Sequence, residues 1–139
     1  MGTINWVAVL VAGISAFVIG GVLYSPGLFG RAWMKDNNLS EEEIKKGNKG
    51  KIFGFTLIFS LLMAVNLAMF LKDPDSLDYG TRTNITWGMT SGFLAGIWTF
   101  CAIAIHSLFE LKSWRLIFIN GGYTIVALVL MGAIIGAWR

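Results

Sequence analysis

The polar residues best placed for chemistry in this sequence lie around its only histidine, His106. Glu110 follows four positions later, and residues four apart are neighbours on one face of a helix. After a short linker, Asn120 and Tyr123 return to a similar depth when the two flanking apolar segments form a helical hairpin. We therefore predict one polar cluster of these four residues, which would relay protons or bind a small polar solute. The alternative is a cluster that only satisfies the hairpin's own donors and acceptors.

Other polar side chains are scattered through the apolar segments, namely Ser15, Ser60, Asn66, Thr90, Ser91, Thr99, Ser107 and Thr124. At such positions we expect them to face protein or water, because hydrocarbon offers no hydrogen-bond partner.

Signatures of enzymes are missing from the sequence. It contains no nucleophile beside a histidine and an acid, no helix with two histidines for zinc, and no glycine loop that cradles phosphate. The single cysteine, Cys101, excludes an intramolecular disulfide and a cysteine-based metal site. We expect no catalysis, no cofactor and no metal, and a lipid-modifying enzyme has the least support.

Four stretches without a charged side chain must position these residues: 3–30, 52–71, 83–109 and 116–138. Each is long enough to cross a bilayer, because a helix rises about 1.5 Å per residue and the hydrocarbon core is about 30 Å thick. Hydrophobic residues make up 55% of the chain, and its mean hydropathy is +0.67. We predict an all-α integral membrane bundle of four transmembrane helices, over about residues 4–24, 51–71, 84–109 and 116–138, in one domain of residues 1–139.

The loop between the first two helices begins with a turn and contains a short helix. Tyr24, Ser25 and Pro26 end the first helix, because proline lacks a backbone donor and disfavours helical geometry in the residue before it. Ser40 followed by Glu43 resembles a capping box, which predicts a short amphipathic surface helix in this loop.

The chain carries eleven Lys and Arg against eight Asp and Glu, a formal net charge of +3. Because the basic residues flank membrane segments and form no single stripe, we expect the lipid bilayer as a partner and exclude nucleic acid. Eight of them lie in residues 31–51 and 112–115, and the other three are Lys72, Arg82 and Arg139. The positive-inside rule then places loops 25–51 and 110–115 in the cytoplasm and both termini outside.

Small residues recur at four-residue spacing, and glycines form the clearest rows. These are Gly88, Gly92 and Gly96 in the third segment and Gly132 and Gly136 in the fourth. Lipid gives helices no hydrophobic reason to associate, so close approach through small residues supplies the contact. The rows serve packing within one chain or between subunits, and spacing alone does not separate the two.

Several blocks of the sequence resemble the four-helix membrane family known as domain of unknown function 1761. They are residues 24–34 (YSPGLFGRAWM), 46–48 (KGN), 108–110 (LFE), 119–123 (INGGY) and 131–138 (MGAIIGAW). The blocks extend over nearly the full length, and the one around Tyr24 is the most specific. The resemblance implies a small integral membrane protein of bacterial type, in the inner (plasma) membrane, and brings no established activity, substrate or cofactor.

Two functions fit these features. In the first, the chain handles a small solute as an oligomeric channel or transporter, and homo-oligomerisation supplies the room that one four-helix unit lacks. In the second, it is a non-transporting scaffold or partner subunit whose basic cytoplasmic loop meets lipid or another protein. No carboxylate lies deep in an apolar segment, which weakens the case for proton-coupled transport. A cavity lined by the polar residues would favour transport, and a dry bundle would favour the scaffold.

Overall fold

The computed structural model describes residues 4–138 except residues 26, 41, 44–46, 48 and 72–83. The regular elements of these residues are the helices α1 (Trp6–Leu23), α2 (Gly30–Asp36), α4 (Lys49–Phe70), α5 (Ile85–Phe109) and α6 (Trp114–Ala137). Four of them are long and apolar enough to cross a membrane, with mean hydropathies from 1.7 to 2.4. The predicted all-helical fold with four membrane-spanning helices is confirmed.

The surface helix predicted after Ser40 lies mostly outside the described residues. One of the two bonds of a capping box is present, because the Glu43 N–H donates to the Ser40 hydroxyl at 3.2 Å.

Helices α1, α5 and α6 each begin after a polar residue that caps them. The caps are Asn5, Asn84 and Ser113. The side-chain oxygen of each accepts a hydrogen bond, at 3.0–3.2 Å, from the backbone N–H of the residue three positions later. Such bonds satisfy donors that have no partner inside the helix. The Ser113 cap corrects the predicted start of the last helix, which begins at Trp114 instead of residue 116 and therefore includes Arg115.

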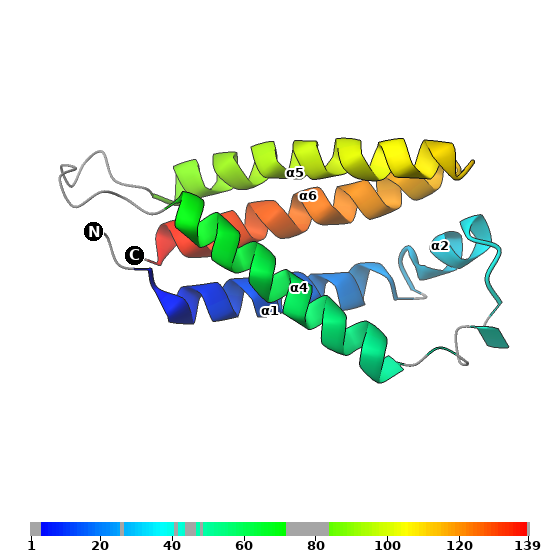
Figure 1. The fold of residues 1–139 in the computed structure, drawn as a ribbon, viewed down its shortest axis with the longest axis horizontal. Helices are drawn as coiled ribbons and strands as arrows, with labels where there is room; N and C mark the ends of the chain where they lie inside the picture. Colours follow the sequence, from blue (N-terminus) through cyan, green and yellow to red (C-terminus); the bar gives the residue numbers. More distant parts are fainter. Residues whose placement is uncertain are drawn as a thin grey trace.

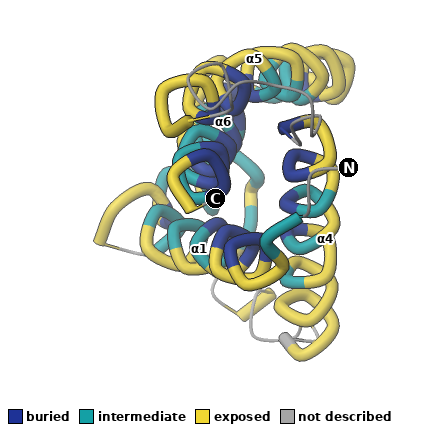
Figure 2. The backbone as a smooth tube through the Cα atoms, turned by 90° about the vertical axis from the view of Figure 1, so that its left-hand side faces the viewer, coloured by how far each residue is buried: buried dark blue, intermediate teal, exposed yellow. Residues whose placement is uncertain are grey.

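The four long helices form a bundle with one open side. α5 packs along α6, α6 packs on α1, and α1 packs on α4, whereas α4 and α5 barely touch within the described part of the chain. α4 crosses α1 obliquely (Figure 1), and the view along the bundle in Figure 2 shows α4 across from α6. The seam between α4 and α5 is therefore the open side.

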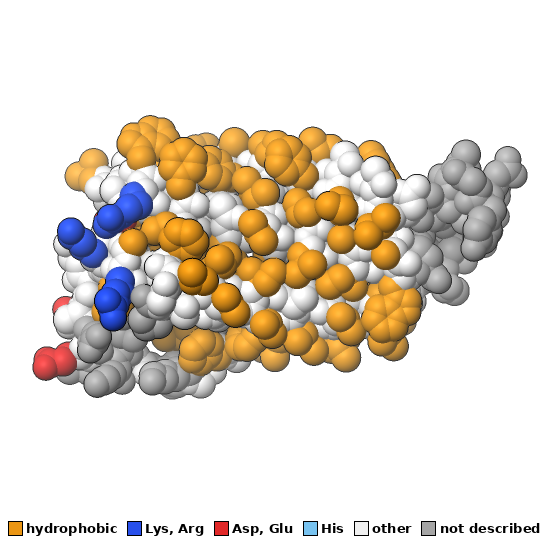
Figure 3. All heavy atoms as spheres, turned by 180° about the vertical axis from the view of Figure 1, so that it is seen from behind, with side chains coloured by type: hydrophobic (Ala, Val, Ile, Leu, Met, Phe, Trp, Pro, Cys, Tyr) orange, Lys and Arg blue, Asp and Glu red, His pale blue; other side chains and the backbone are white. Residues whose placement is uncertain are grey.

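Alanines fill the interior of the bundle together with larger side chains such as Leu71 and Met131, and other large apolar residues face outward. The core shared by α1, α4 and α6 includes Ala12, Ala16, Ala64, Ala68 and Met131, each at most 3% exposed. By contrast, Trp98 is 80% exposed and Phe109 is 85% exposed. Figure 3 shows hydrophobic side chains along the length of one face, and the Lys and Arg side chains of the described residues seen in this view lie at one end. This is the distribution expected when lipid surrounds the helices and a headgroup layer meets their ends.

The glycine rows of α5 and α6 lie against each other within the chain. A Cβ atom at Gly88 would collide with the backbone carbonyl of Gly132, and one at Gly132 with that of Gly88. The neighbouring contacts follow the same pattern and pair Gly92 with Leu128, Gly96 with Ile125, and Gly136 with Asn84. Backbones this close require a glycine on at least one of the two helices at each contact. Of the two roles left open by the spacing, the structure places these glycines in contacts between helices of one chain.

Candidate functional site

Of the four residues predicted to form one polar cluster, two lie together and two lie apart from them. Asn120 and Tyr123 belong to the face of α6 that meets α1, whereas His106 and Glu110, at the end of α5, are exposed. The buried residue in that turn of α5 is Ser107, and one residue turns a helix by about 100°. His106 is therefore turned away from the buried face, and the structure does not bring the four together.

Asn120 and Tyr123 instead form a network with Tyr24, at the end of α1. The Tyr24 hydroxyl donates a hydrogen bond to Asn120 Oδ1 at 2.6 Å, and the Tyr123 hydroxyl donates to the Ala16 carbonyl at 2.9 Å. The two tyrosine rings meet edge to face with their centroids 5.5 Å apart. Because both hydroxyl groups bond across the helix interface, the network fixes α6 against α1.

The turn after α1 holds Tyr24 in place for this network. The Ser25 carbonyl accepts two hydrogen bonds, from the N–H of Leu28 at 3.0 Å and from the N–H of Gly30 at 2.9 Å. A Cβ atom at Gly30 would collide with the Tyr24 carbonyl. α2 can begin directly against the end of α1 because its first residue is glycine. Pro26, the third residue of the predicted turn, lies outside the described residues.

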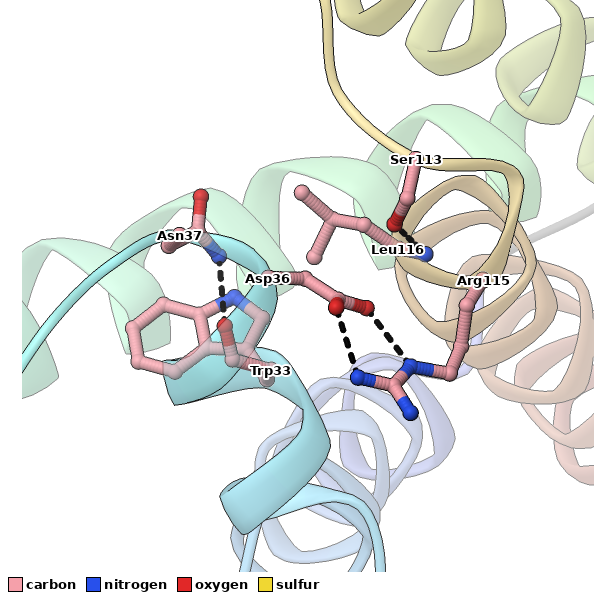
Figure 4. Close-up of polar contacts among 6 residues, drawn as sticks. All are labelled: Trp33, Asp36, Asn37, Ser113, Arg115 and Leu116. Carbon is pink, nitrogen blue, oxygen red and sulfur yellow. Dashed lines mark hydrogen bonds and ion pairs between the residues drawn. The ribbon is translucent and has the colours of Figure 1, made fainter.

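An ion pair ties the end of α2 to the start of α6. The Arg115 guanidinium donates to both carboxylate oxygens of Asp36, from Nε at 2.8 Å and from Nη2 at 2.6 Å (Figure 4). The Asp36 side chain is only 10% exposed, whereas that of Arg115 is 52% exposed. The hydrogen bonds from Arg115 hold the pKa of the Asp36 carboxyl below its usual range, against the opposing effect of burial. Sequence reasoning missed this pair because 79 positions separate the two residues.

The open seam between α4 and α5 contains a cleft of about 520 Å³. Its lining consists of Met63, Asn66, Leu67 and Phe70 from α4, Trp87, Ser91, Leu94, Ala95, Trp98 and Thr99 from α5, and Leu128 from α6. None of these side chains carries a charge, and most are apolar. The volume lies within the usual range for small-molecule sites, roughly 300–1,000 Å³. The cleft can therefore hold a small apolar molecule, but it offers that molecule no acid or base.

Ser91 differs from the other polar residues of the cleft. It is 4% exposed, and its buried hydroxyl has no hydrogen-bond partner among the described residues. Nearby polar side chains are satisfied within their own helices, because Thr90, Thr99 and Asn66 each donate to the carbonyl four residues back, at 2.8–2.9 Å. Sequence reasoning placed Ser91 in the third apolar segment without a role, and nothing in its spacing marks it.

The cleft is the feature whose volume and shape suit a ligand. Within the part of the chain that the structure describes, no three His, Cys, Asp or Glu side chains gather as a metal site would require. Cys101 is a free, exposed residue of α5. The candidate functional site is accordingly the α4–α5 cleft, with Ser91 as its buried polar group.

No curated protein and no solved structure matches the chain. A family model does match, over residues 7–136, which include all of α4 and α5 and nearly all of α1 and α6. This match confirms the resemblance carried by the sequence blocks around Tyr24 and Asn120. The chain belongs to this family, which is described as Protein of unknown function (DUF1761).

Proposed function

We propose that this membrane protein is a transporter of a small, predominantly apolar solute, which it binds in the cleft between α4 and α5. The observation that carries the proposal is the cleft itself, about 520 Å³ of largely apolar space on the open side of the bundle. Phe70 and Trp98 at its edges are 68% and 80% exposed. Because this side of the bundle faces lipid, a solute dissolved in the bilayer can enter sideways.

The packing of α4 supports uptake and release. α4 packs mainly on α1, and its contact with α6 is small. Few contacts are therefore lost when α4 moves away from α5, and segments with few buried contacts open at low free energy. Such a movement would widen the cleft.

The position of the cleft favours a transporter over a channel. Its lining residues come from the second half of α4, from positions 87–99 of α5 and from Leu128 of α6, so the cleft lies toward one end of the bundle and reaches about its middle. Among the described residues, the cleft of one chain therefore offers a binding place that does not extend to the other end of the bundle. Homo-oligomerisation, in which a second copy completes the path, is part of the proposal. Catalysis is not part of it.

The orientation that we propose places the protein in a bacterial inner membrane with both termini outside. It rests on the count of eight Lys and Arg against three in the short loops. Arg31, Lys35 and Arg115 are exposed at the end of the bundle that contains α2. With that end in the cytoplasm, the cleft opens into the outer half of the bilayer.

A scaffold is the second candidate function. It is favoured by the basic end of the molecule in Figure 3 and by Leu28 and Phe29, which are 54% and 47% exposed just before α2. Apolar and basic side chains side by side suit the headgroup layer of an anionic membrane. In this role the cleft would bind nothing, and the basic end would recruit lipid or another protein.

Binding and movement of a phenylnaphthylamine fluorophore test the proposed function, with the full chain in nanodiscs and in liposomes. Ala95→Trp and Asn66→Trp fill the cleft from opposite walls and should weaken binding by about tenfold or more. Ile97→Trp adds the same ring to the lipid-facing side of α5, where Ile97 is 41% exposed, and should bind as the parent does.

Saturable binding that both cleft variants weaken, together with passage of the fluorophore across liposomes, supports the transporter. Binding that both variants leave unchanged would show that the cleft does not hold the solute. No saturable binding, combined with strong association with anionic vesicles, would favour the scaffold instead.

A further inference from the structure

We propose that Ser91 supplies the polar contact of the cleft and that the solute is an uncharged lipophile with one hydrogen-bond-accepting oxygen, such as a ketone. This inference rests on the proposed function and names the chemical class of its solute. In it, the Ser91 side chain changes rotamer so that its hydroxyl faces the cleft and donates to the solute oxygen, while the rest of the solute lies among apolar side chains.

Among the described residues that line the cleft, Ser91 carries the buried side-chain polar atom without a hydrogen-bond partner. Ser91 lines the cleft with part of its surface, while its hydroxyl is buried and bonds to none of the described residues. A buried hydroxyl without a partner is disfavoured, because it has given up its hydrogen bonds to water. A serine in a helix can donate to the carbonyl four residues back, as Thr90 and Thr99 do. Ser91 makes no such bond, and a solute oxygen in the cleft would satisfy it.

The remaining lining determines the rest of the solute. None of the described residues that line the cleft is charged, so a charged solute would lose its hydration without gaining a counter-ion from them. The rings of Phe70, Trp87 and Trp98 offer flat apolar surfaces on both walls. A rigid hydrocarbon or aromatic body therefore fits this lining, and an ion does not.

The depth of Ser91 in the membrane indicates whether its acceptor oxygen comes from a free lipophile or from a bilayer phospholipid. Ser91 lies six positions before Ile97, the midpoint of α5, which is about 9 Å along the helix axis. Half of the hydrocarbon core measures about 15 Å. With the middle of α5 at the middle of the bilayer, the hydroxyl lies about 6 Å inside the hydrocarbon, below the layer that contains the ester groups of phospholipids. A free lipophile reaches this depth, whereas a lipid ester does not.

A matched pair of competitors tests the inference, because benzophenone and diphenylmethane share two rings and differ in one carbonyl oxygen. Each is titrated against the bound phenylnaphthylamine fluorophore, with the full chain in nanodiscs of ester-linked lipid. The parent should prefer benzophenone by about tenfold, the gain expected from one hydrogen bond. Ser91→Ala should abolish the preference and leave the affinity for diphenylmethane within about twofold.

The matched control is Thr99→Val, which removes a hydroxyl of the same cleft that already bonds to the Ala95 carbonyl at 2.8 Å. The preference for benzophenone should survive in this variant. A preference that persists in Ser91→Ala would overturn the role of Ser91. Photo-crosslinking of benzophenone, followed by peptide mass analysis, should modify residues of α4 and α5 around the cleft, and modification elsewhere would also overturn the inference.

Nanodiscs of ether-linked lipid, which lack the ester carbonyl, distinguish the two sources of an acceptor oxygen. Equal affinity for benzophenone in both lipids is expected for a free lipophile. A clear rise in affinity in ether-linked lipid would show that a phospholipid ester occupies the site, and would overturn the choice of solute. Failure of the proposed function gives a different result. The fluorophore then does not bind, or its affinity is the same in the parent, Ala95→Trp and Asn66→Trp. If the fluorophore binds in the cleft and the two competitors are equal, only the inference about Ser91 fails.

Discussion

The Tyr24 hydroxyl at the end of α1 donates a hydrogen bond to the Asn120 side chain in α6, 96 positions further along the chain. The two residues belong to the blocks 24–34 and 119–123, which carry the family resemblance. The contact therefore joins the turn between α1 and α2 to the first half of α6. The Asp36–Arg115 pair makes a second link, from the end of α2 to the start of α6.

Removing the Tyr24 hydroxyl should destabilise the bundle. Tyr24→Phe keeps the ring but leaves the side-chain oxygen of Asn120, Oδ1, without its donor. This loss should lower the free energy of unfolding by about 1 to 2 kcal/mol. Tyr123→Phe should have a smaller effect, because its acceptor, the Ala16 carbonyl, lies within α1 and can keep a helical bond. Unfolding in a graded denaturing detergent measures both. A double variant with Asn120→Leu should recover part of the loss, and equal effects of the two single tyrosine variants would contradict this account.

Adding a methyl group at the α5–α6 contact should also destabilise the protein. The Cβ atom of Gly92→Ala would collide with the Leu128 carbonyl, so the helices must separate, at a cost of about 1 to 3 kcal/mol. Gly92→Leu should reduce the yield of folded protein further. The control is Gly21→Ala, because a Cβ atom at Gly21 meets nothing within 4 Å and alanine favours the helix. Thermal unfolding and size-exclusion chromatography compare the variants, and equal stability of Gly92→Ala and Gly21→Ala would rule out the close contact.

The membrane fold could be predicted because lipid limits the choices so strongly. A chain with four long uncharged segments must satisfy its backbone within helices, so length and apolarity were enough to place α1, α4, α5 and α6. Even the error at the start of α6 has a local cause. Ser113 caps a helix that includes Arg115, whereas the prediction assigned that charged residue to the linker.

The contacts of the candidate sites could not be predicted in the same way. Spacing describes neighbours on one helix, so it correctly places His106 one turn from Glu110, but it does not say which face of α5 meets α6. That face is set by the contact of Gly88 with Gly132. Pairs such as Tyr24 with Asn120 depend on how helices distant in sequence pack. The cleft beside Ser91 exists only because α4 packs on α1 and not on α5.

The Asp36–Arg115 pair should make stability depend on pH in the acid range. Because the pKa of Asp36 is lower in the folded protein than in the unfolded chain, the pair contributes stability above the unfolded value of about 4. This contribution should be lost as pH falls through the folded pKa. Asp36→Asn should be less stable than the parent at neutral pH and should lose less stability on acidification. Arg31→Gln, which removes an exposed cation of α2, is the control and should keep the parent's acid dependence. An unchanged acid dependence in Asp36→Asn would show that the pair does not govern it.

The proposed orientation predicts which loops a reagent reaches from outside the cell. With Cys101→Ser as background, Lys112→Cys should resist a membrane-impermeant thiol reagent in intact cells and react after lysis. Asp75→Cys, which lies outside the described residues, should react in intact cells, because it belongs to the loop placed outside. Labelling of position 112 from outside would reverse the orientation and place the cleft in the inner half of the bilayer.

Substitutions of His106 distinguish two hypotheses about this residue. In one it belongs to a structural or proton-carrying polar cluster, and in the other it is an exposed side chain. In the predicted cluster, His106→Leu would leave Glu110, Asn120 or Tyr123 short of a partner and cost about 1 to 3 kcal/mol. In the structure, His106 is exposed, and Asn120 and Tyr123 are bonded to Tyr24 and Ala16. We therefore expect His106→Leu and His106→Asn to lie within about 0.5 kcal/mol of the parent in unfolding experiments, as surface substitutions usually do. The flux of the fluorophore across liposomes should show the same pH dependence in all three proteins, because His106 is exposed and does not line the cleft. A leucine variant that is strongly destabilised, or a flux that loses its pH dependence in both variants, would restore His106 to a polar cluster and contradict its exposed position.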